Sequence, residues 1–514
     1  MVTAHPIIPG FNPDPSICRV SNNYYLVTST FQFFPGVPVY HSQDLTRWTQ
    51  IGNAIHRPQQ LKDLDQTVIN GGVWAPTIRH HNGIFYICTT IVFTDKPATD
   101  FTRWKNFIVT ANDPAGPWSD PVFFEYPGYD TSLFFTEDNR CFIQGSFYYR
   151  IRPEISQIEL DVKTGKALSA PKRIWSGTPG AKAPEAPHIL YKNGWYYLII
   201  AEGGTEFGHS VSLARARQLC APENEWEEYP GNPLLTHRDL PGELIQCTGH
   251  ADIFDDPQGN YWMVLLAVRA YDGERYPMGR ESWLIPITWK DEDAWPSVQL
   301  PLEAPRDCSH PGPNVEKVLK IETNVCSFGQ GDKPSWNPSW LWLRTPDFSR
   351  YLLTDRDQTT DEYLGCVLKA SQIGLSDAKH SPTMILMRQC HVRCRATVQL
   401  DLASIENDTT AGLAAYLDCN HYEVVSCHRK HDSVVLECLQ ETVKFLDIDT
   451  VTLAIEADER SYRFEYKLAN AGWNVISTTD AKDLTFGFTG VLFGLFAVGN
   501  GDVHFSRFTY QVIG

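Results

Sequence analysis

Short runs of apolar and aromatic residues, joined in pairs by turn residues, recur through the first part of the chain. The segment 182–197 shows the unit: Glu185 precedes an apolar run, Asn193 and Gly194 follow it, and an aromatic run begins at Trp195. This pattern predicts a hairpin of two short strands, because an Asn-Gly pair between strand-like runs favours a tight β-turn. Similar units begin at Asp14, Ala75, Asp130 and His250.

The heads of these five units are 61, 55, 55 and 65 residues apart. A strand-and-turn repeat of this size is typical of propeller blades, so the pattern predicts a five-bladed β-propeller over residues 1–312. The first strand of each blade lines the axis of a propeller, and its head should therefore lie at one mouth of the funnel. The carboxylates of Asp14, Asp130 and Glu185 would meet His250 there. Like charges this close are costly unless chemistry or a ligand uses them.

The hydrophobic pattern changes in the second part of the chain. Residues 304–330 are rich in proline, glycine and charge, which predicts a linker. Beyond it, apolar and polar residues alternate, for example in the stretches 393–401, 451–455 and 463–468. Alternation without a helical pattern favours a β-sandwich (jelly-roll-like) domain over residues 313–514. The expected fold class is all-β, a five-bladed propeller followed by a sandwich.

Composition and charge narrow the partners. The chain has 514 residues, a net charge of -17 and a pI of about 5.4, which argues against nucleic acid or an anionic membrane as a partner. Neutral sugars are compatible with such a surface, and the aromatic content of 12% offers ring faces for them. No apolar run reaches the ~20 residues of a membrane span.

The cysteines and the N-terminus bear on the compartment. Thirteen cysteines, an odd number without CxxC pairs, favour buried free thiols in a reducing compartment. The N-terminus lacks the charged-then-apolar pattern of a signal peptide. We therefore expect a cytoplasmic protein, with a secreted mature form as the alternative. The sequence leaves a homo-oligomer open.

Each candidate side chain also has a plainer interpretation. An aspartate before proline is usually a turn residue, as Asp14 would be on its own, and Glu185 could be an ordinary loop carboxylate. Their shared place in the repeat favours a functional role. Arg280 is either a donor to sugar hydroxyls or half of a surface ion pair with Glu281 or another acid. The glycine-rich loop 201–209 lacks the lysine and helix of a phosphate-binding loop, so we discount phosphate binding there.

Five short motifs of the chain form a recognisable set. They are Pro9-Gly10-Phe11-Asn12-Pro13-Asp14-Pro15-Ser16, Gly72-Val73-Trp74-Ala75-Pro76, Tyr129-Asp130-Thr131-Ser132-Leu133-Phe134, Glu185-Ala186-Pro187-His188 and Gly279-Arg280-Glu281. Together they resemble glycoside hydrolase family 43, more narrowly its two-domain β-xylosidases and α-L-arabinofuranosidases. The resemblance runs the whole length of the chain and implies a five-bladed propeller plus β-sandwich, in agreement with the repeat count.

The resemblance implies hydrolysis with inversion by three acids. Asp14 would be the general base that deprotonates a water, and Glu185 the general acid that protonates the leaving oxygen. Asp130 would orient the acid and keep its pKa high through like-charge proximity. Because inversion needs room for the water, Asp14 and Glu185 should lie ~6.5–9.5 Å apart.

Further contacts follow from the same resemblance. Arg280 would hold sugar hydroxyls at the reacting subsite, and Phe31 and Trp74 would form its apolar wall. His250 matches an axial histidine that in many members contacts a bound calcium ion or its waters. No cofactor is required for the reaction. A structural Ca²⁺ at the propeller axis is the one metal implied, and no oxygen-rich calcium loop is visible in the sequence.

The expected function is release of terminal β-1,4-linked D-xylose from xylo-oligosaccharides or arabinoxylan by an exo-acting, inverting hydrolase. The alternatives are an α-L-arabinofuranosidase or a bifunctional enzyme, because Ala186 stands where the family often has glycine and the approach to Arg280 is compact. A carbohydrate-binding propeller without catalysis is disfavoured, since it would not need three acids. A retaining fructosidase-type propeller is disfavoured because its Asn-Asp-Pro-Asn-Gly block is absent.

Overall fold

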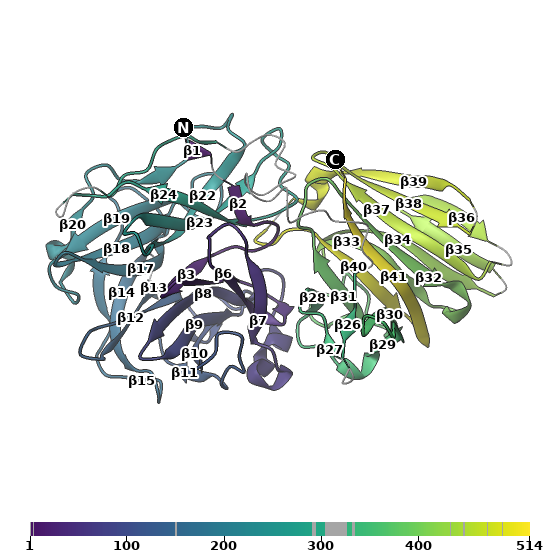
Figure 1. Cartoon of the computed structure of the whole chain (residues 1–514), viewed down its shortest axis with the longest axis horizontal. Helices are drawn as coiled ribbons and strands as arrows, with labels where there is room; N and C mark the ends of the chain where they lie inside the picture. Colours follow the sequence, from purple (N-terminus) through teal and green to yellow (C-terminus); the bar gives the residue numbers. More distant parts are fainter. Residues whose placement is uncertain are drawn as a thin grey trace. The chain divides into compact units, whose positions relative to one another are not determined.

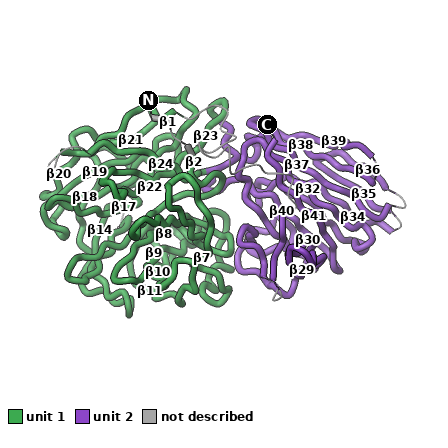
Figure 2. Tube along the Cα trace, in the orientation of Figure 1, with its two compact units in different colours: residues 1–273, 280–315 green, residues 274–279, 316–514 purple. Residues whose placement is uncertain are grey.

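The computed structural model describes residues 2–3, 5–149, 152–289, 294–303, 326–331, 335–431, 433–445, 448–469, 471–485 and 487–513 (Figure 1). The chain divides into two compact units, coloured separately in Figure 2. Unit 1 comprises residues 1–273 and 280–315, and unit 2 comprises residues 274–279 and 316–514. Most of the predicted linker and the predicted border between residues 312 and 313 lie outside the described residues, so that border stays a prediction.

Unit 1 is a five-bladed β-propeller within the described residues, as the repeat predicts. The first blade contains β3 (Ser16–Val20), β4 (Asn23–Val27), β6 (Gly36–Ser42) and β7 (Thr49–Ile55), and the second β8 (Gly72–His81), β9 (Ile84–Val92), β10 (Trp104–Ala111) and β11 (Val122–Phe124). The third contains β12 (Gly128–Phe135), β13 (Cys141–Tyr149), β14 (Arg152–Asp161), β15 (Lys166–Ala167) and β16 (Lys172–Trp175). Strands within each blade pair antiparallel.

The two remaining blades complete the ring. The fourth contains β17 (Glu185–Lys192), β18 (Trp195–Glu202), β19 (Ser210–Ala216), β20 (Glu227–Glu228) and β21 (Leu235–Thr236). The fifth contains β22 (Ile245–Asp255), β23 (Tyr261–Arg269), β24 (Glu281–Ile287) and β2 (His5–Ile8). Because β2 comes from the start of the chain and pairs with β24, the last blade ties both ends of the propeller together. The innermost strands β3, β8, β12, β17 and β22 neighbour one another around the axis.

Apolar side chains fill the space between successive blades. Ile143 and Ile158 of the third blade pack with Ile108 of the second, and Leu198 of the fourth packs with Ile155 of the third. Each fully buried aliphatic side chain of this kind contributes about 1.5–3 kcal/mol. The continuous core fixes each inner strand against its neighbours, which positions the heads of those strands.

The five inner strands share one register around the axis. A shift in strand pairing lies directly before Thr77, Ser132, His188 and Asp252, and Ser16 starts the inner strand of the first blade. These five residues therefore occupy equivalent positions.

This register corrects one assumption of the sequence analysis. Asp14, Asp130 and His250 each precede the equivalent residue of their own strand by two positions. In the fourth blade, the residue two positions before the equivalent His188 is Ala186. Glu185 stands one residue earlier, where the third blade has Tyr129. The assumption that all three acids share one repeat position is therefore wrong for Glu185.

Unit 2 is a β-sandwich, as the alternation predicts. One sheet runs in the order β27 (Ser335–Trp336), β26 (Gly329–Gln330), β30 (Glu362–Lys369), β41 (Asp502–Val512), β32 (Cys394–Asp401), β37 (Thr450–Ala457), β38 (Ser461–Leu468), β39 (Trp473–Asp480), with β29 (Tyr351–Arg356) paired to β30. The other includes β36 (Glu441–Phe445), β35 (Ser433–Cys438), β34 (His421–Lys430), β33 (Thr410–Asp418), β40 (Leu492–Val498), β31 (Met384–Arg388) and β28 (Trp340–Leu343).

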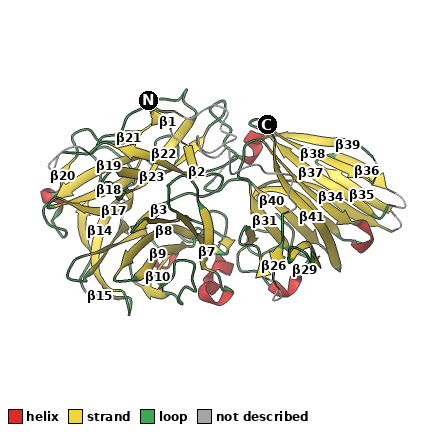
Figure 3. Cartoon of the chain, viewed as in Figure 1, coloured by secondary structure: helices red, strands yellow, loops and turns green. Residues whose placement is uncertain are grey.

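Few other elements are described. Short strands β1 (Val2–Thr3) and β25 (Leu302–Glu303) pair in parallel, and β5 (Phe33–Phe34) lies in unit 1. The described helices are short 3₁₀ turns, red in Figure 3: Pro58–Gln66, Phe101–Arg103, Glu223–Glu225, Phe348–Arg350, Leu402–Ser404 and Ala481–Leu484. The all-β expectation is confirmed.

The predicted alternation holds strictly in β32, where every second side chain is buried. It fails in β38 at Glu465, which is buried although the pattern places it on the polar side. The strand pairing shifts at that residue, and Arg395 and Arg463 both bind its carboxylate. An ion pair within the sheet thus takes the place of an apolar contact.

The structure shows the state of the cysteines and whether a described helix could span a membrane. Every described cysteine is a free thiol, and all except Cys220, Cys326 and Cys390 are buried. A reducing compartment stays a prediction. Within the described residues, no helix combines the length and apolar character that crossing a membrane requires.

Candidate active site

Asp14 lies almost fully buried directly before β3, and three neighbours hold its carboxylate. Ser29 Oγ donates a hydrogen bond of 2.5 Å to Oδ2, and Arg280 Nη1 donates one of 3.1 Å to Oδ1. His250 Nδ1 lies 3.4 Å from the same Oδ1. The alternative of a turn aspartate without further role does not account for this set of partners, and Arg280 pairs with Asp14 instead of Glu281.

The other two acids meet on the adjacent inner strands. Tyr129 donates its phenolic hydrogen to Glu185 Oε1 at 2.6 Å. The backbone N–H of Ala186 donates to Asp130 Oδ2 at 3.2 Å, so Asp130 holds the peptide that follows Glu185. Asp130 is nearly fully buried, whereas Glu185 stays partly accessible. The arrangement fixes Glu185 from both sides and leaves its second carboxyl oxygen for a proton.

The environments drive the pKa values of the three acids apart. Burial would raise the pKa of Asp14, but Arg280, His250 and the Ser29 hydroxyl outweigh it and hold that pKa below its ordinary value. Burial and the neighbouring Glu185 and Asp14 raise the pKa of Asp130 well above the ordinary value. Burial also raises the pKa of Glu185, and the charge of Asp14 adds to this effect. These directions favour the ionised form of Asp14 and the protonated form at the neighbouring Asp130 and Glu185.

A line of contacts joins Arg280 to Glu185. The Arg280 guanidinium lies over the Phe31 ring at 5.4 Å, and Phe31 contacts Trp74 at 6.0 Å between ring centroids. Trp74 meets Tyr129 edge-on at 5.7 Å, and Tyr129 binds Glu185. The rings of Phe31 and Trp74, which are predicted to form an apolar wall, therefore lie between Arg280 and the Tyr129–Glu185 pair. Trp74 is the more accessible of the two.

The glycine-rich loop 201–209 also serves the site. Thr205 Oγ1 accepts a hydrogen bond of 2.9 Å from Arg280 Nη1, the nitrogen that also binds Asp14. His209 lies against Gly249, where an added Cβ would come within 2.3 Å of the ring. Through Thr205, this loop supports Arg280.

His250 lies beside Asp14, as predicted, and is buried. Burial lowers the pKa of His250 to about 4, so the imidazole is neutral at ordinary pH. At that pH it can accept or donate a hydrogen bond, and its charged form stabilises the Asp14 carboxylate only in the acidic range where both groups titrate. Within the described ranges, no group of three or more His, Cys, Asp or Glu side chains is arranged to hold a metal ion.

A fully buried ion pair anchors the strand that carries Arg280. Arg269 binds both oxygens of Glu281 at 2.7 and 2.8 Å, and Glu281 Oε1 also accepts from the backbone of Gly10 at 2.9 Å. The backbone N–H of Asn12 donates to the Arg280 carbonyl at 3.1 Å. Glu281 thus fixes the segment before Asp14 to the segment after Arg280.

Strained backbone concentrates at these positions. Four site residues adopt left-handed conformations, with φ of 56° at Asp14, 51° at Asp130, 49° at His250 and 49° at Phe31. Such conformations cost of order 1–3 kcal/mol for residues other than glycine and persist only where the surroundings enforce them. Phe31 O lies only 2.1 Å from where a Cβ on Gly72 would be, so glycine is required there.

Several side chains of the site were missed from the sequence. Six of them contact or support the candidate catalytic residues: Ser29, Tyr129, Thr205, His209, Arg269 and Glu281. Three more lie at the axis: Arg79, His188 and Asp252. Tyr129 adjoins Asp130 and occurs in a quoted motif, so the register of the blades could have found it. The loop contacts have no local signal, because their partners are far apart in sequence.

The fold and the site define the class of glycoside hydrolases, and the comparisons with known proteins fix the family. Residues 3–296 match glycosyl hydrolases family 43, and residues 332–511 match the beta xylosidase C-terminal concanavalin A-like domain. The chain belongs to glycoside hydrolase family 43.

Relatives cover nearly the whole chain. A non-reducing end alpha-L-arabinofuranosidase, BoGH43B of Bacteroides ovatus, is 33% identical over 97% of this chain and 92% of its own length. A xylosidase/arabinosidase of Butyrivibrio fibrisolvens is 34% identical over 98% and 96%. The crystal structure of xylan beta-1,4-xylosidase from Bacillus halodurans superposes with a TM-score of 0.84 at 27% identity, covering 99% of this chain and 100% of that one. The chain is therefore a glycosidase of the xylosidase/arabinofuranosidase type.

Replacing Tyr129 by phenylalanine tests the contact to Glu185. The lost hydrogen bond favours the charged form of the carboxyl, so the pKa of Glu185 should rise further. We expect the alkaline limb of the kcat/KM profile to move to higher pH and kcat to fall by up to roughly tenfold. Tyr126→Phe is the matched control, because Tyr126 is a buried tyrosine in the segment directly before β12 and its hydroxyl donates to the backbone carbonyls of Gly145 and Ser156. An unchanged alkaline limb in Tyr129→Phe would contradict this role.

Proposed function

We propose that the chain is an exo-acting, inverting β-xylosidase that releases terminal β-1,4-linked D-xylose from xylo-oligosaccharides or arabinoxylan. The observation that carries this proposal is the arrangement of three acids at the inner strands: Ser29 and Arg280 bind Asp14, whereas Tyr129 binds Glu185 and Asp130 holds the peptide that follows it. These surroundings lower the pKa of Asp14 and raise the pKa values of Asp130 and Glu185. One ionised and one protonated acid in the same site are what acid–base hydrolysis of a glycoside requires.

In the proposed reaction Asp14 takes a proton from a water while that water attacks the anomeric carbon. Glu185 gives its proton to the leaving oxygen as the glycosidic bond breaks. The water oxygen becomes the new anomeric hydroxyl on the face opposite the leaving group, so the configuration inverts. Asp130 keeps the Ala186 peptide in place, and its repulsion with Glu185 keeps one proton at this pair of carboxyl groups for Glu185 to deliver. The separation of ~6.5–9.5 Å between the two carboxyl groups stays a prediction.

Arg280 is proposed to bind sugar hydroxyls at the reacting subsite. Its guanidinium is already oriented by Asp14, Thr205 and the Phe31 ring, so little conformational freedom is lost on binding. Trp74 offers the accessible aromatic face. The deep burial of Asp14, Asp130 and Arg280 supports entry of a single terminal unit, and one relative is itself named for action at the non-reducing end.

The second candidate is an α-L-arabinofuranosidase or an enzyme with both activities. The specific observation in its favour is the name of the Bacteroides ovatus relative, whereas the Bacillus halodurans structure is named a xylan β-1,4-xylosidase. The Butyrivibrio fibrisolvens relative carries both names. Ala186 follows Glu185 directly and is buried. Its side chain is a methyl group, so it offers no polar contact that would select one pentose.

The test compares hydrolysis of an aryl β-D-xyloside and an aryl α-L-arabinofuranoside by the full chain, together with the first products from xylotriose. We expect a higher kcat/KM for the xyloside, and xylose with xylobiose as first products. Comparable kcat/KM values would establish a bifunctional enzyme, and a dominant arabinofuranoside rate would establish the second candidate. Absence of hydrolysis on all three substrates would overturn the proposal.

The pH dependence of kcat/KM should be bell-shaped. On the acid side, activity requires ionised Asp14, and its lowered pKa should keep activity down to below about pH 4. On the alkaline side, activity requires the proton shared by Asp130 and Glu185, and their raised pKa values should keep it to well above about pH 4.3. Initial rates at substrate concentrations far below KM measure both limbs. An alkaline limb at the pKa of an ordinary glutamate would contradict the shared proton.

A further inference from the structure

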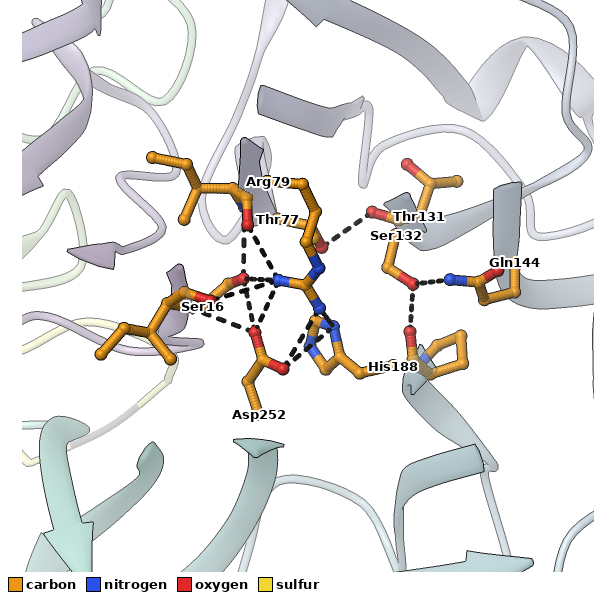
Figure 4. Close-up of polar contacts among 11 residues, drawn as sticks. Ser16, Thr77, Arg79, Thr131, Ser132, Gln144, His188 and Asp252 are labelled. Carbon is orange, nitrogen blue, oxygen red and sulfur yellow. Dashed lines mark hydrogen bonds and ion pairs between the residues drawn. The ribbon is translucent and has the colours of Figure 1, made fainter. Parts of the chain in front are cut away.

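A guanidinium lies on the axis of the propeller, where four inner strands approach one another. Arg79 extends from β8, and its Nη1 donates to Asp252 Oδ2 at 2.9 Å and to Ser16 Oγ at 3.1 Å. Its Nη2 donates to Asp252 Oδ1 at 3.2 Å and to His188 Nδ1 at 3.2 Å. Figure 4 shows these side chains converging on the guanidinium from several directions. One cation thus contacts the first, second, fourth and fifth blades.

The partners of Arg79 form part of a ring of polar contacts between neighbouring blades. Ser16 Oγ donates to Asp252 Oδ2 at 2.8 Å and accepts from the backbone of Ile78 at 3.2 Å. Thr77 Oγ1 donates to the Thr131 carbonyl at 3.2 Å, and Ser132 Oγ donates to the Pro187 carbonyl (Figure 4). Side chains at the five equivalent positions therefore link each blade to the next. Arg79 binds three of them, Ser16, His188 and the charged Asp252.

This ring lies next to the proposed catalytic residues along each strand. Ser16 follows Asp14 by two residues, His188 follows Glu185 by three, and Asp252 follows His250 by two. Each strand has a left-handed residue or pairing shift just before its contact with Arg79. A displacement of the axis would therefore move Asp14 and Glu185 relative to each other, and a misplacement of 1 Å can cost about a hundredfold in rate.

The calcium ion implied by the family resemblance does not fit this axis. Calcium takes six to eight oxygen ligands in proteins. Here the carboxylate of Asp252 already accepts from Ser16, the Ile17 backbone and both terminal nitrogens of Arg79. The carboxylate of Asp14 is paired with Arg280. A divalent cation at the axis would lie close to two guanidinium ions that already occupy these carboxylates, and the repulsion would be large in a buried site.

We propose that Arg79 is a resident cation that takes the place of an axial metal ion and positions the inner strands carrying Asp14 and Glu185. Arg79 is thus a positioning residue, because it contacts none of the reacting groups. The positioning role rests on the function proposed above. The expectation that the fold needs no metal ion does not rest on that function, since it concerns the axis alone.

The first experiment uses the unaltered chain. Metal content is measured by mass spectrometry, and the Tm and kcat/KM are measured before and after chelator treatment and after addition of calcium chloride. We expect no stoichiometric metal, and the same Tm and kcat/KM in all three states. A bound divalent ion whose removal lowers the Tm or kcat/KM would overturn the proposal. If the unaltered chain proves inactive on pentosides, the function proposed above fails, and metal content and Tm still test the axis.

The second experiment replaces the cation. Arg79→Ala should lower kcat by roughly ten- to a hundredfold with KM changed much less, because the strands move while the sugar contacts remain. Arg79→Lys keeps a charge but loses the fork of donors, so it should recover part of kcat. Arg140→Ala is the matched control: Arg140 forms a two-pronged ion pair with Glu159 in the same propeller, at the surface.

The outcomes separate positioning from general destabilisation. Recovery of kcat in Arg79→Lys at equal KM supports a cation that sets geometry. An Arg79→Ala variant with the kcat of the Arg140→Ala control would overturn the proposal, and so would an Arg79→Lys variant no better than Arg79→Ala. If Arg79→Ala does not fold, Arg79→Lys and the metal measurements still decide.

Discussion

Asp14→Asn is expected to lower kcat by roughly 10²–10⁴-fold, which is the range of a general base. The asparagine keeps the shape of the side chain and its contact with Ser29, but it cannot take the proton of the attacking water. The loss should be similar for an aryl xyloside and for xylobiose, because activation of the water is needed whatever group leaves. Steady-state kinetics on both substrates measure it.

The control for this variant must separate lost chemistry from a lost ion pair. Asp255→Asn breaks an aspartate–arginine contact of the same propeller, the 2.9 Å pair with Arg19, which is partly exposed. It should keep kcat unchanged, since exposed pairs contribute only about 0–1 kcal/mol. If Asp14→Asn kept more than a tenth of the original kcat while folded, the role of Asp14 as base would be wrong.

Glu185→Gln should show an effect that depends on the leaving group. Without a proton donor, kcat on xylobiose should fall by roughly 10²–10⁴-fold. A dinitrophenyl xyloside needs little protonation to leave, so its loss should be much smaller. The alkaline limb of kcat/KM should also disappear, because the shared proton no longer takes part. The ratio of rates on the two substrates is the decisive quantity.

Glu159→Gln supplies the comparison, since Glu159 pairs with Arg140 at the surface of the third blade. It should leave both rates and the pH profile unchanged. Equal losses on xylobiose and on the dinitrophenyl xyloside in Glu185→Gln would show that Glu185 acts in some way other than leaving-group protonation.

The charges of the site suit the transition state that glycosidases share. Asp14 and Asp252 are each paired with a guanidinium, from Arg280 and Arg79 respectively. In the proposed reaction, Asp130 and Glu185 together hold one proton and one negative charge. The site therefore keeps one net negative charge, which favours the oxocarbenium-like transition state. Transfer of one proton to Asp14 and one from Glu185 leaves this total unchanged.

Much of the fold could be predicted from the sequence because it depends on local patterns. Paired apolar runs with tight turns recur five times, and alternation of polar and apolar residues marks the sandwich. The candidate residues Asp14, Asp130, Glu185 and His250 do lie together around the axis, as the repeat predicts. Their roles stay predictions until the variants are measured.

The remainder could not be predicted because it depends on register and on distant partners. Glu185 stands one residue before the place that Asp130 occupies, and this offset appears only when the strand pairings of the third and fourth blades are compared. Arg79 follows a quoted motif, yet its partner Asp252 is 173 residues away in sequence. Glu465 is buried because Arg395 and Arg463 bind its carboxylate, and the alternation of residues alone does not identify these partners.

The most direct test of the central claim is the anomeric configuration of the first sugar released, followed by proton NMR during the first minutes of hydrolysis of a β-D-xyloside. An inverting reaction predicts that α-D-xylose appears first and that β-D-xylose forms only by mutarotation. First release of β-D-xylose would mean a retaining reaction, and Asp14 could then no longer be a base acting on water.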